Sequence, residues 1–225
     1  MNEQLLRIGK AYDLTAAQFA AGIEPRDSVP AEIKILPGYD ELVDDQWCSS
    51  AAPDIREYLN PKEGMCYLDA GCCANLANYR LHVWPSVYYG VDISPVLIGA
   101  MRAYVEKYRI AIGGLYHTDI VTLPFGDEYF DIATVIGVLE YYTLEYTTYA
   151  LKELCRVLKQ NAKMVVDIAN LEHPYVDTMF RLEEHYGRPL IPKKRNSFES
   201  LLKTAFITDN VDDSRVMLKY FVRKR

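Results

Sequence analysis

The stretch YLDAGCCANLANY, residues 67–79, places an acid, a glycine and two adjacent cysteines where an apolar run gives way to a helix-like segment. Thiols beside a carboxylate could hold a metal, form a redox pair or belong to a cofactor-binding loop. Cys72 and Cys73 are adjacent, and adjacent thiols are poorly placed to ligate one tetrahedral ion. The five cysteines contain no C-x-x-C pair and the four histidines show no metal-site spacing, so we expect no bound metal.

Composition limits the class of protein. The chain has 225 residues, of which 50% are hydrophobic, and a net charge of -6. A chain of this length can bury a substantial core, and its acidic balance argues against nucleic acid or anionic lipid as a partner. No apolar run approaches the roughly 20 residues that span a bilayer, and the first residues lack a signal-peptide pattern. We therefore expect a cytoplasmic protein, a monomer or homodimer, that acts on a small molecule.

Apolar runs alternate with helical patterns through most of the chain. The alternation implies an α/β fold with parallel strands joined by right-handed crossovers. Near the C-terminus, a helix and two possible antiparallel strands follow. The predicted strands are residues 65–69, 87–92, 114–119, 129–139, 163–169, 206–209 and 215–222, and the predicted helices are residues 95–109, 145–158 and 197–205.

The N-terminal region has a different pattern. Apolar residues recur at three- and four-residue spacing within residues 2–22 and predict one face of a helix. Three prolines interrupt residues 24–38, which we expect to form a connecting loop. Ser49 or Ser50 can cap a further helix that runs to about Leu59, ahead of the first strand.

Three of the five predicted parallel strands end in an acid, namely Asp69, Asp92 and Asp119. Ligands of open parallel sheets bind at the carboxyl ends of the strands near the topological switch point, so these carboxylates could meet one ligand. Asp92 lies 21 positions after Gly71, close to the ~20-residue separation expected for a ribose-binding acid. The sequence DISP, which begins at Asp92, equally fits a helix N-terminus with Ser94 as its cap.

Residues 64–169 resemble a class I S-adenosylmethionine-dependent methyltransferase of the small-molecule type. The segment TDIVTLPFGDEYFDIATVIGVLEYY, residues 118–142, is similar to that family's entry into its fourth strand. The segment LKELCRVLKQNAKMVVDIAN, residues 151–170, is similar to its next helix, turn and fifth strand. The resemblance implies a Rossmann-like, doubly wound and mostly parallel seven-stranded sheet with a C-terminal antiparallel hairpin. It also implies S-adenosylmethionine as the cofactor.

The resemblance further implies a cofactor site along the strand ends. The family's loop reads acid-x-G-x-G-x-G, whereas here Gly71 remains and Cys73 and Asn75 occupy the second and third glycine positions. This cofactor has no pyrophosphate to lie against three glycines, so partial loss is compatible with binding. Asp92 would accept from the ribose hydroxyls and Asp119 from the adenine amino group. The implied cofactor-binding residues are Asp69, Gly71, Cys72, Asn75, Asp92, Ile93, Asp119, Ile120 and Gly137.

Candidate catalytic residues follow the fourth and fifth strands. Positioning of the acceptor can supply much of the barrier reduction in methyl transfer without a dedicated base. Glu140 could receive an amine or cationic substrate, and the nearby tyrosines could offer π faces to a positively charged sulfur. His173 can accept a proton near neutral pH, although a histidine before proline is more often a loop residue. The catalytic candidates are Glu140, Tyr142 and His173, and the substrate-binding candidates are Tyr12, Tyr141, Asn170 and Tyr175.

Domain organisation and reaction are predicted together. Residues 61–225 are expected to form the catalytic domain and residues 1–60 a helical lid, with Tyr12 and Phe19 turned toward the core and ligand protecting the segment up to Trp47 from proteolysis. The alternative is a helix that merely packs on the outside of the sheet.

Three functions stay open: methyl transfer to a small metabolite, cyclisation or transfer of the cofactor's aminocarboxypropyl arm, and a non-catalytic methyltransferase-like partner subunit. Products separate the first two, because methyl transfer leaves S-adenosylhomocysteine and the other reaction leaves methylthioadenosine.

Overall fold

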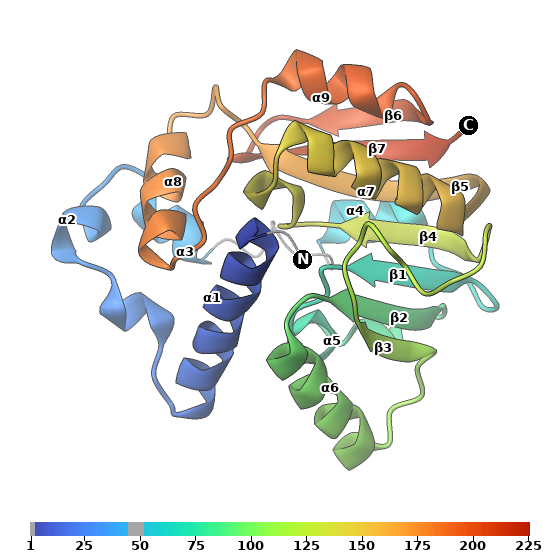
Figure 1. Ribbon diagram of the computed structural model, residues 1–225, viewed down its shortest axis with the longest axis horizontal. Helices are drawn as coiled ribbons and strands as arrows, with labels where there is room; N and C mark the ends of the chain where they lie inside the picture. The colour runs from blue at the N-terminus through green and yellow to red at the C-terminus, as the bar shows by residue number, and fades with distance from the viewer. Residues whose placement is uncertain (1–2, 45–51) are drawn as a thin grey trace.

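A seven-stranded sheet organises the computed structural model, which describes residues 3–44 and 52–225 (Figure 1). The strand order is β3-β2-β1-β4-β5-β7-β6. Strands β1 to β5 pair in parallel, whereas β7 runs antiparallel to both β5 and β6. The predicted Rossmann-like sheet with a C-terminal antiparallel hairpin is therefore confirmed. The strands are β1 (Cys66–Ala70), β2 (Val87–Asp92), β3 (Gly114–His117), β4 (Phe130–Val135), β5 (Leu158–Ala169), β6 (Phe206–Asp212) and β7 (Met217–Lys224).

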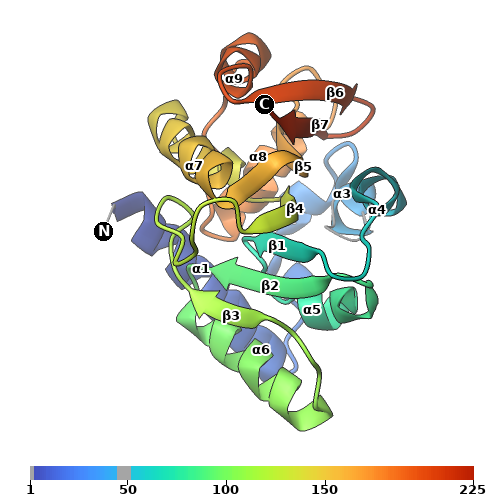
Figure 2. The same ribbon diagram turned by 90° about the vertical axis from the view of Figure 1, so that its right-hand side faces the viewer.

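Helices cover both faces of the sheet (Figure 2). Successive strand residues point to opposite faces, so Tyr67 and Val165 join one hydrophobic core, and Leu68 and Val166 join the other. The core around Leu68 is covered by α7 (Leu144–Val157) and α9 (Arg195–Leu202). The core around Tyr67 is covered by α4 (Pro53–Leu59), α5 (Asn75–Asn78) and α6 (Pro95–Tyr108).

The largest differences from the predicted strand boundaries are at the end of β4 and the start of β5. β4 ends at Val135 and not near residue 139, because Gly137 adopts a φ of +70° and turns the chain out of the sheet. β5 begins at Leu158, five residues before the predicted start at 163, and its pairing with β4 shifts register there. Asn161 takes a φ of +60° at this irregularity, a conformation that asparagine tolerates better than most residues.

The sequence predicted the N-cap residues of two helices, and the structure confirms one of these predictions. Ser94 precedes α6 and its Oγ accepts from the backbone N–H of Leu97 at 3.0 Å, as the sequence DISP predicts. In contrast, α4 begins at Pro53, and its N-cap residue is Ala52. The predicted caps Ser49 and Ser50 lie outside the described residues.

The N-terminal helix α1 (Glu3–Ala20) lies at the edge of the sheet where β1 and β2 end, and it contacts α6 (Figure 1). The predicted loop that follows contains the short helices η1 (Pro25–Ser28) and α2 (Ala31–Lys34), and α3 (Tyr39–Asp44) comes next. The side chain of Phe19 and the whole of Trp47 lie outside the described residues.

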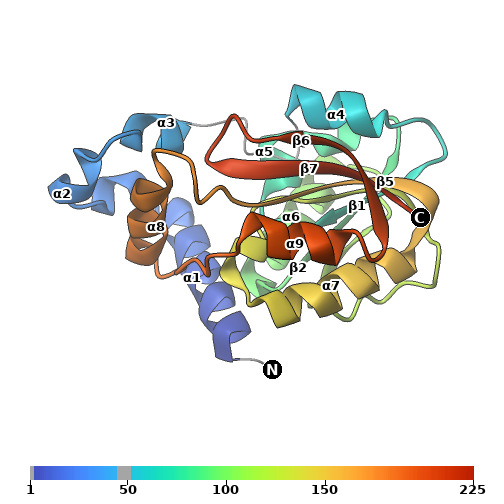
Figure 3. The ribbon, with the colours of Figure 1, turned by 90° about the horizontal axis from the view of Figure 1, so that it is seen from above.

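An unpredicted helix, α8 (Val176–His185), follows β5 and contacts both α2 and α3 (Figure 3). The hydroxyl of Thr178 donates to the carbonyl oxygen of Pro37 at 2.8 Å, and Leu182 packs with Val29 and Tyr39. The N-terminal segment is thus held on one side by α6, through α1, and on the other by α8. Both attachments flank the carboxyl-end edge of the sheet.

Candidate cofactor and substrate site

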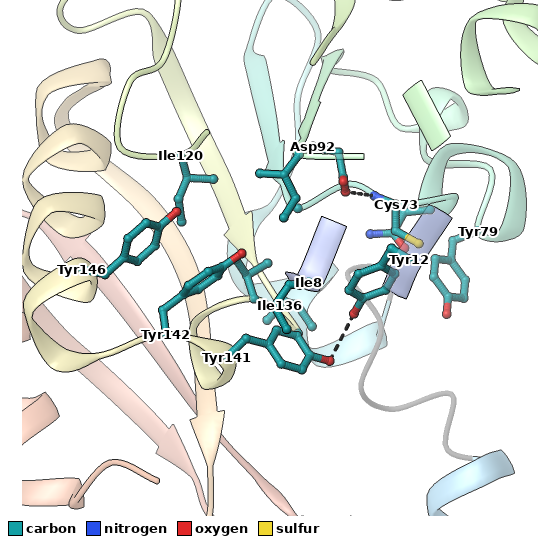
Figure 4. A pocket seen from close by; sticks show the side chains of 15 residues that line it. Ile8, Tyr12, Cys73, Tyr79, Asp92, Ile120, Ile136, Tyr141, Tyr142 and Tyr146 are labelled. Atoms are coloured by element: carbon teal, nitrogen blue, oxygen red, sulfur yellow. Dashed lines mark hydrogen bonds between the residues drawn. The ribbon is translucent and has the colours of Figure 1, made fainter. Parts of the chain in front are cut away.

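A cavity of about 210 Å³ opens at the carboxyl ends of β1, β2 and β4 (Figure 4). The loop after each of these strands contributes to its wall, and α1 closes the opposite side. Nine of the predicted site residues meet here although they come from separate segments of the chain. They are Tyr12, Gly71, Asn75, Asp92, Ile93, Ile120, Gly137, Tyr141 and Tyr142.

The loop after β1 has a glycine-like backbone despite its missing glycines. Gly71 has a φ of +81°, and a Cβ there would stand 2.1 Å from Cγ2 of Val138, so no other residue fits without movement. Cys73 also adopts a positive φ, +43°, at the position where the resembled family carries its second glycine. The backbone N–H groups of Gly71 and Cys72 both donate to the carbonyl of Val91 at 2.9 Å. The loop therefore keeps its tight turn with a small side chain in place of one glycine.

The two adjacent cysteines have different surroundings. Cys72 is buried in the core, and its Sγ would stand 2.9 Å from a Cβ placed on Gly90, which explains a glycine within β2. Cys73 lines the cavity, and burial raises the pKa of its thiol to about 12. A thiol so protected from ionisation is a poor nucleophile or metal ligand. The predicted contact of Cys72 with a cofactor is therefore not made by its side chain, which faces the core.

Asp69 lies beneath the cavity and not in its wall. Its buried carboxylate accepts from the hydroxyls of Tyr88 and Thr134, each at 2.9 Å, and from the side-chain amide of Asn75 at 3.2 Å. These bonds join β1 to its neighbours β2 and β4 and to the start of α5. Asp69 can therefore position the loop, while the predicted direct contact with a cofactor is not provided by this geometry.

Asp92 is a lining carboxylate with its own partners. Its Oδ2 accepts from the backbone N–H of Cys73 and its Oδ1 from that of Ser94, both at 2.8 Å. The side chain is 7% exposed, and burial raises its pKa while these two N–H donors oppose that rise. An ionised carboxylate offers about four acceptor sites, so each oxygen can still accept from a hydroxyl in the cavity.

The third strand-end acid stands at the border of the cavity. Ile93 and Ile120 line the cavity itself, whereas Asp119 lines a neighbouring groove beside α1. Asp119 accepts from the hydroxyl of Tyr146 and from the backbone N–H of Val121. The two isoleucines could hold a planar ring between them, with Asp119 at its edge.

Four tyrosines form much of the remaining wall. The hydroxyls of Tyr12 and Tyr141 are 3.1 Å apart, and that of Tyr141 donates to Glu183 at 3.0 Å. The rings of Tyr142 and Tyr146 stack with their centres 4.2 Å apart. Burial raises the pKa of all four phenols, so they are neutral near pH 7 and act as hydrogen-bond donors or apolar walls, not as bases.

The predicted catalytic acid Glu140 lines a second, adjoining cavity of about 150 Å³. Gly137 and Tyr141 belong to the walls of both cavities, so Glu140 stands one residue layer behind the first. Burial and the neighbouring Asp167 raise the pKa of the Glu140 carboxyl well above its ordinary value. Sequence reasoning did not single out Asp167, which ends no strand and is followed by apolar residues.

The segment after β5 does not bring its predicted site residues to either cavity wall. The amide of Asn170 donates to the carbonyls of Asp213 and Arg215, which ties this loop to the start of β7. His173 accepts from the backbone N–H of Tyr175, whose ring packs against Gly38. The structure therefore corrects the predictions for Asn170, His173 and Tyr175, because their side chains hold loops together instead of facing the site.

Several lining residues were missed. Ile8 precedes Tyr12 by one helical turn on α1, so the same apolar spacing that identified Tyr12 could have found it. Tyr146 lies in the first turn of α7, four residues after Tyr142, but Tyr142 is extended and precedes the helix, so no helical spacing links the two. Ile136, Val138 and Tyr79 carry no comparable sequence signal, because their place in the wall depends on how the strand-end loops turn.

Within residues 3–44 and 52–225, no three histidine, cysteine, aspartate or glutamate side chains are grouped as metal ligands would be. Over the same residues, no helix has the length and apolar character needed to cross a bilayer.

Comparison with known proteins identifies the region that carries this site. Residues 68–166 match the model of a family described as a methyltransferase domain. This confirms the resemblance to the class I methyltransferases. The methyltransferase-like region runs from β1 into β5 and so contains the strand-end loops of the first cavity.

A protein of Methanocaldococcus jannaschii, described as uncharacterized, is 29% identical to this chain over 168 residues. The match covers 74% of this chain and 66% of the relative, so the chain spans just under two thirds of that protein's length. The similarity extends beyond the methyltransferase-like region, which is shorter than the aligned segment.

Solved structures show the same fold. Magnesium protoporphyrin IX methyltransferase from Synechocystis PCC 6803, with bound SAM, aligns over 100% of this chain and 99% of its own with a TM-score of 0.65 and 13% identity. A 1,6-didemethyltoxoflavin-N1-methyltransferase from Burkholderia thailandensis, with S-adenosylhomocysteine, aligns over 83% and 82%, with a TM-score of 0.61 and 15% identity. The cyclase SpnF aligns over 96% and 94%, with a TM-score of 0.64 and 16% identity. A fold shared by methyltransferases and a cyclase leaves the reaction to the site.

Proposed function

We propose that this protein binds S-adenosylmethionine in the first cavity and transfers its methyl group to a small molecule. One observation carries the proposal: Gly71 after β1, Asp92 at the end of β2 and Ile120 after β3 line one cavity at the carboxyl-end edge of the sheet. This is the edge at which ligands bind open parallel sheets. The methyltransferase-like region and the structural neighbours crystallised with SAM or S-adenosylhomocysteine support it.

The residues present fit the cofactor. Asp92 places a carboxylate in the wall with acceptor capacity left for two ribose hydroxyls. Ile93 and Ile120 provide the apolar faces for a purine, beside Asp119. Gly71 offers bare backbone where its positive φ and Val138 exclude a side chain. When bound, S-adenosylmethionine supplies a methyl group on a positively charged sulfur.

The chain's own contribution to the reaction is positioning. The neutral phenols of Tyr141 and Tyr142 wall the cavity and can present π faces to a cation. Cys73 stays protonated, so it does not compete as a nucleophile. Exclusion of water and alignment of the acceptor with the methyl group then supply the rate enhancement.

The N-terminal residues serve this site in the proposed function. We assign residues 1–60 as an extension that covers the cavity and residues 61–225 as the catalytic domain. Ile8 and Tyr12 line the cavity from α1, and the hydroxyl of Tyr12 lies 3.1 Å from that of Tyr141. A ligand would therefore enter or leave through movement of α1. The net charge of -6 favours a small molecule over nucleic acid as the substrate.

Transfer or cyclisation of the aminocarboxypropyl arm is the second candidate reaction, favoured by the altered glycine loop, in which Cys73 adds a side chain to the cavity wall. Titration of the purified protein with S-adenosylhomocysteine by calorimetry tests binding first. Absence of binding at millimolar ligand would support a non-catalytic methyltransferase-like subunit instead. Mass analysis of products after incubation with S-adenosylmethionine and an extract of small metabolites then separates S-adenosylhomocysteine, the methyl-transfer product, from methylthioadenosine.

A further inference from the structure

The second cavity lies behind the wall that Gly137 and Tyr141 form for the first. It lies between the end of β5, the start of β7, and helices α3 and α8. Its volume, about 150 Å³, is close to that of an engineered apolar protein cavity that holds one benzene molecule. Most of its lining is apolar: Leu42, Met179, Leu182, Leu190, Val216 and Met217.

Two buried carboxylates interrupt this apolar lining. Glu140 is 5% exposed and Asp167 is 1% exposed. Oδ1 of Asp167 accepts from the backbone N–H of Gly137 at 2.9 Å. In contrast, Oε2 of Glu140 and Oδ2 of Asp167 have no hydrogen-bond partner within the part of the chain that the structure describes. A buried oxygen without a donor costs about 1 to 3 kcal/mol, and more when charged, so two of them in one cavity call for an explanation.

The nearby basic side chains are engaged elsewhere. The ammonium of Lys193 donates to the carbonyls of Leu139 and Ile191, at 2.6 and 3.3 Å. Lys219 forms ion pairs with Asp54 and Asp212. It lies directly opposite Asp167 in the β5–β7 ladder, where its charge opposes the rise in the pKa of Asp167. These lysines affect the two carboxylates only by longer-range electrostatic attraction, because neither ammonium group donates a hydrogen bond to Oε2 of Glu140 or Oδ2 of Asp167.

The third acid of the cavity is already neutralised. Glu183 accepts a hydrogen bond from Nη2 of Arg188 at 2.9 Å and forms an ion pair with the same guanidinium, whose Nε is 2.8 Å from Oε2. It also accepts from the hydroxyl of Tyr141. Arg188 in turn lies over the ring of Tyr12, with its central carbon 4.7 Å from the ring centre. Among the described residues, Glu140 and Asp167 are therefore the carboxylates of this cavity that form no ion pair.

Burial raises the pKa of both groups, that of Asp167 to about 7. Near neutral pH the pair consequently holds protons unless a positive charge enters the cavity. A metal ion is a poor candidate, because the described residues provide no third ligand grouped with these two. An organic ammonium, which needs two or three acceptors and an apolar surface for its carbon body, suits the donor set and the lining.

We propose that the second cavity binds a protonated amine carried on an apolar group about the size of a benzene ring, with its N–H groups donating to Glu140 Oε2 and Asp167 Oδ2. This rests on the proposed function, since the amine-bearing molecule is then the methyl acceptor and reaches the first cavity past Gly137 and Tyr141. The ammonium is the recognition handle, and it determines the substrate class as a cationic, largely apolar amine.

Benzylamine and its uncharged counterpart benzyl alcohol are suitable probes, followed by amide chemical shifts of the full-length protein at pH 7. We expect benzylamine to bind about tenfold more tightly than benzyl alcohol, since a hydrogen bond to a charged group exceeds a neutral one by about 1.4 kcal/mol. Glu140→Gln and Asp167→Asn should each remove most of that difference and leave the affinity for benzyl alcohol unchanged. Glu184→Gln, at an exposed acid of the same helix α8 that lines the cavity, is the matched control and should change neither affinity.

Equal affinity of the wild-type protein for the two probes, or undiminished benzylamine binding in both variants, would overturn the proposal. A parallel titration with S-adenosylhomocysteine keeps the two ideas separate. Benzylamine binding without S-adenosylhomocysteine binding would support the cationic cavity and refute the proposed function. Binding of S-adenosylhomocysteine without any preference for benzylamine would refute the cationic cavity alone.

Discussion

Replacement of Asp92 by alanine is the most direct test of the first cavity. The side chain contributes two things: acceptor sites that face the cavity, and hydrogen bonds to the backbone N–H groups of Cys73 and Ser94. Alanine removes both. Asparagine keeps one acceptor oxygen, but its NH2 group then faces one of the two N–H donors, so the loop still loses a bond.

The expected loss of affinity follows from these contacts. A hydrogen bond to a charged acceptor contributes about 1.5 to 3 kcal/mol. Burial already raises the pKa of Asp92, so part of the carboxylate's advantage is offset by desolvation. We therefore expect Asp92→Ala to weaken binding of S-adenosylhomocysteine by about 1 to 3 kcal/mol, which is roughly 5- to 150-fold.

Calorimetry well below the melting temperature measures this loss on folded protein. The melting temperature should also fall, because two backbone N–H groups lose their acceptor. Asp177→Ala, at an exposed acid in the first turn of α8, is the matched control and should retain full affinity. An affinity for Asp92→Ala within twofold of the wild-type value would refute the ribose contact and leave Asp92 as a residue that only ties the loop to α6.

Further outcomes are expected from other parts of the molecule. Gly71→Ala should lower both the melting temperature and the affinity for S-adenosylhomocysteine, since a Cβ would meet Val138 at 2.1 Å. Gly99→Ala, in an open position on α6, is the control and should be neutral or stabilising. Equal melting temperatures of the two variants would contradict this expectation. Because burial raises the pKa of Asp167 to about 7, the folded state binds its proton more tightly than the unfolded chain, so stability should fall as pH rises from about 4 to 7. Asp167→Asn should flatten that part of the profile in urea titrations, and an unchanged slope would refute the assignment. Saturating S-adenosylhomocysteine should slow proteolysis within residues 24–44, which flank α1, while equal cleavage rates would remove the lid role. EDTA should leave the melting temperature unchanged, and a large drop would reveal a structural metal.

The presence and order of the strands were the most predictable features of the fold. β2 was predicted at residues 87–92 and spans Val87–Asp92, because a continuous apolar run bounded by an acid is a local signal. Helix α8 was not predicted, although Met179 and Leu182 carry a helical spacing. Its buried face packs against Val29 and Tyr39, which lie more than a hundred residues earlier in the chain. No local sequence pattern predicts a contact between segments so far apart.

Within the site, distance from a strand end does not separate the correct predictions from the wrong ones, since Tyr142 lines the cavity seven residues after β4, whereas Asn170, directly after β5, does not. Ile93 and Gly137 reach the cavity because the strand that precedes each sets its direction. His173 and Tyr175 lie three or more residues beyond the end of β5, where the path depends on what the loop packs against. There the ring of Tyr175 stands over Gly38, and this contact carries the segment away from the cavity.

The sequence by itself determined the alternation of strands and helices, the acids at the strand ends and the tight turn at Gly71, because each depends on neighbouring residues and backbone sterics. Only the tertiary structure decided which distant side chains meet. Tyr12 and Tyr141 are 129 positions apart yet share a hydrogen bond, and Glu140 and Asp167 share a buried cavity. Burial and desolvation arise from all elements that pack around a group, so the unusual protonation of Asp167 follows from the assembled fold and from no segment alone.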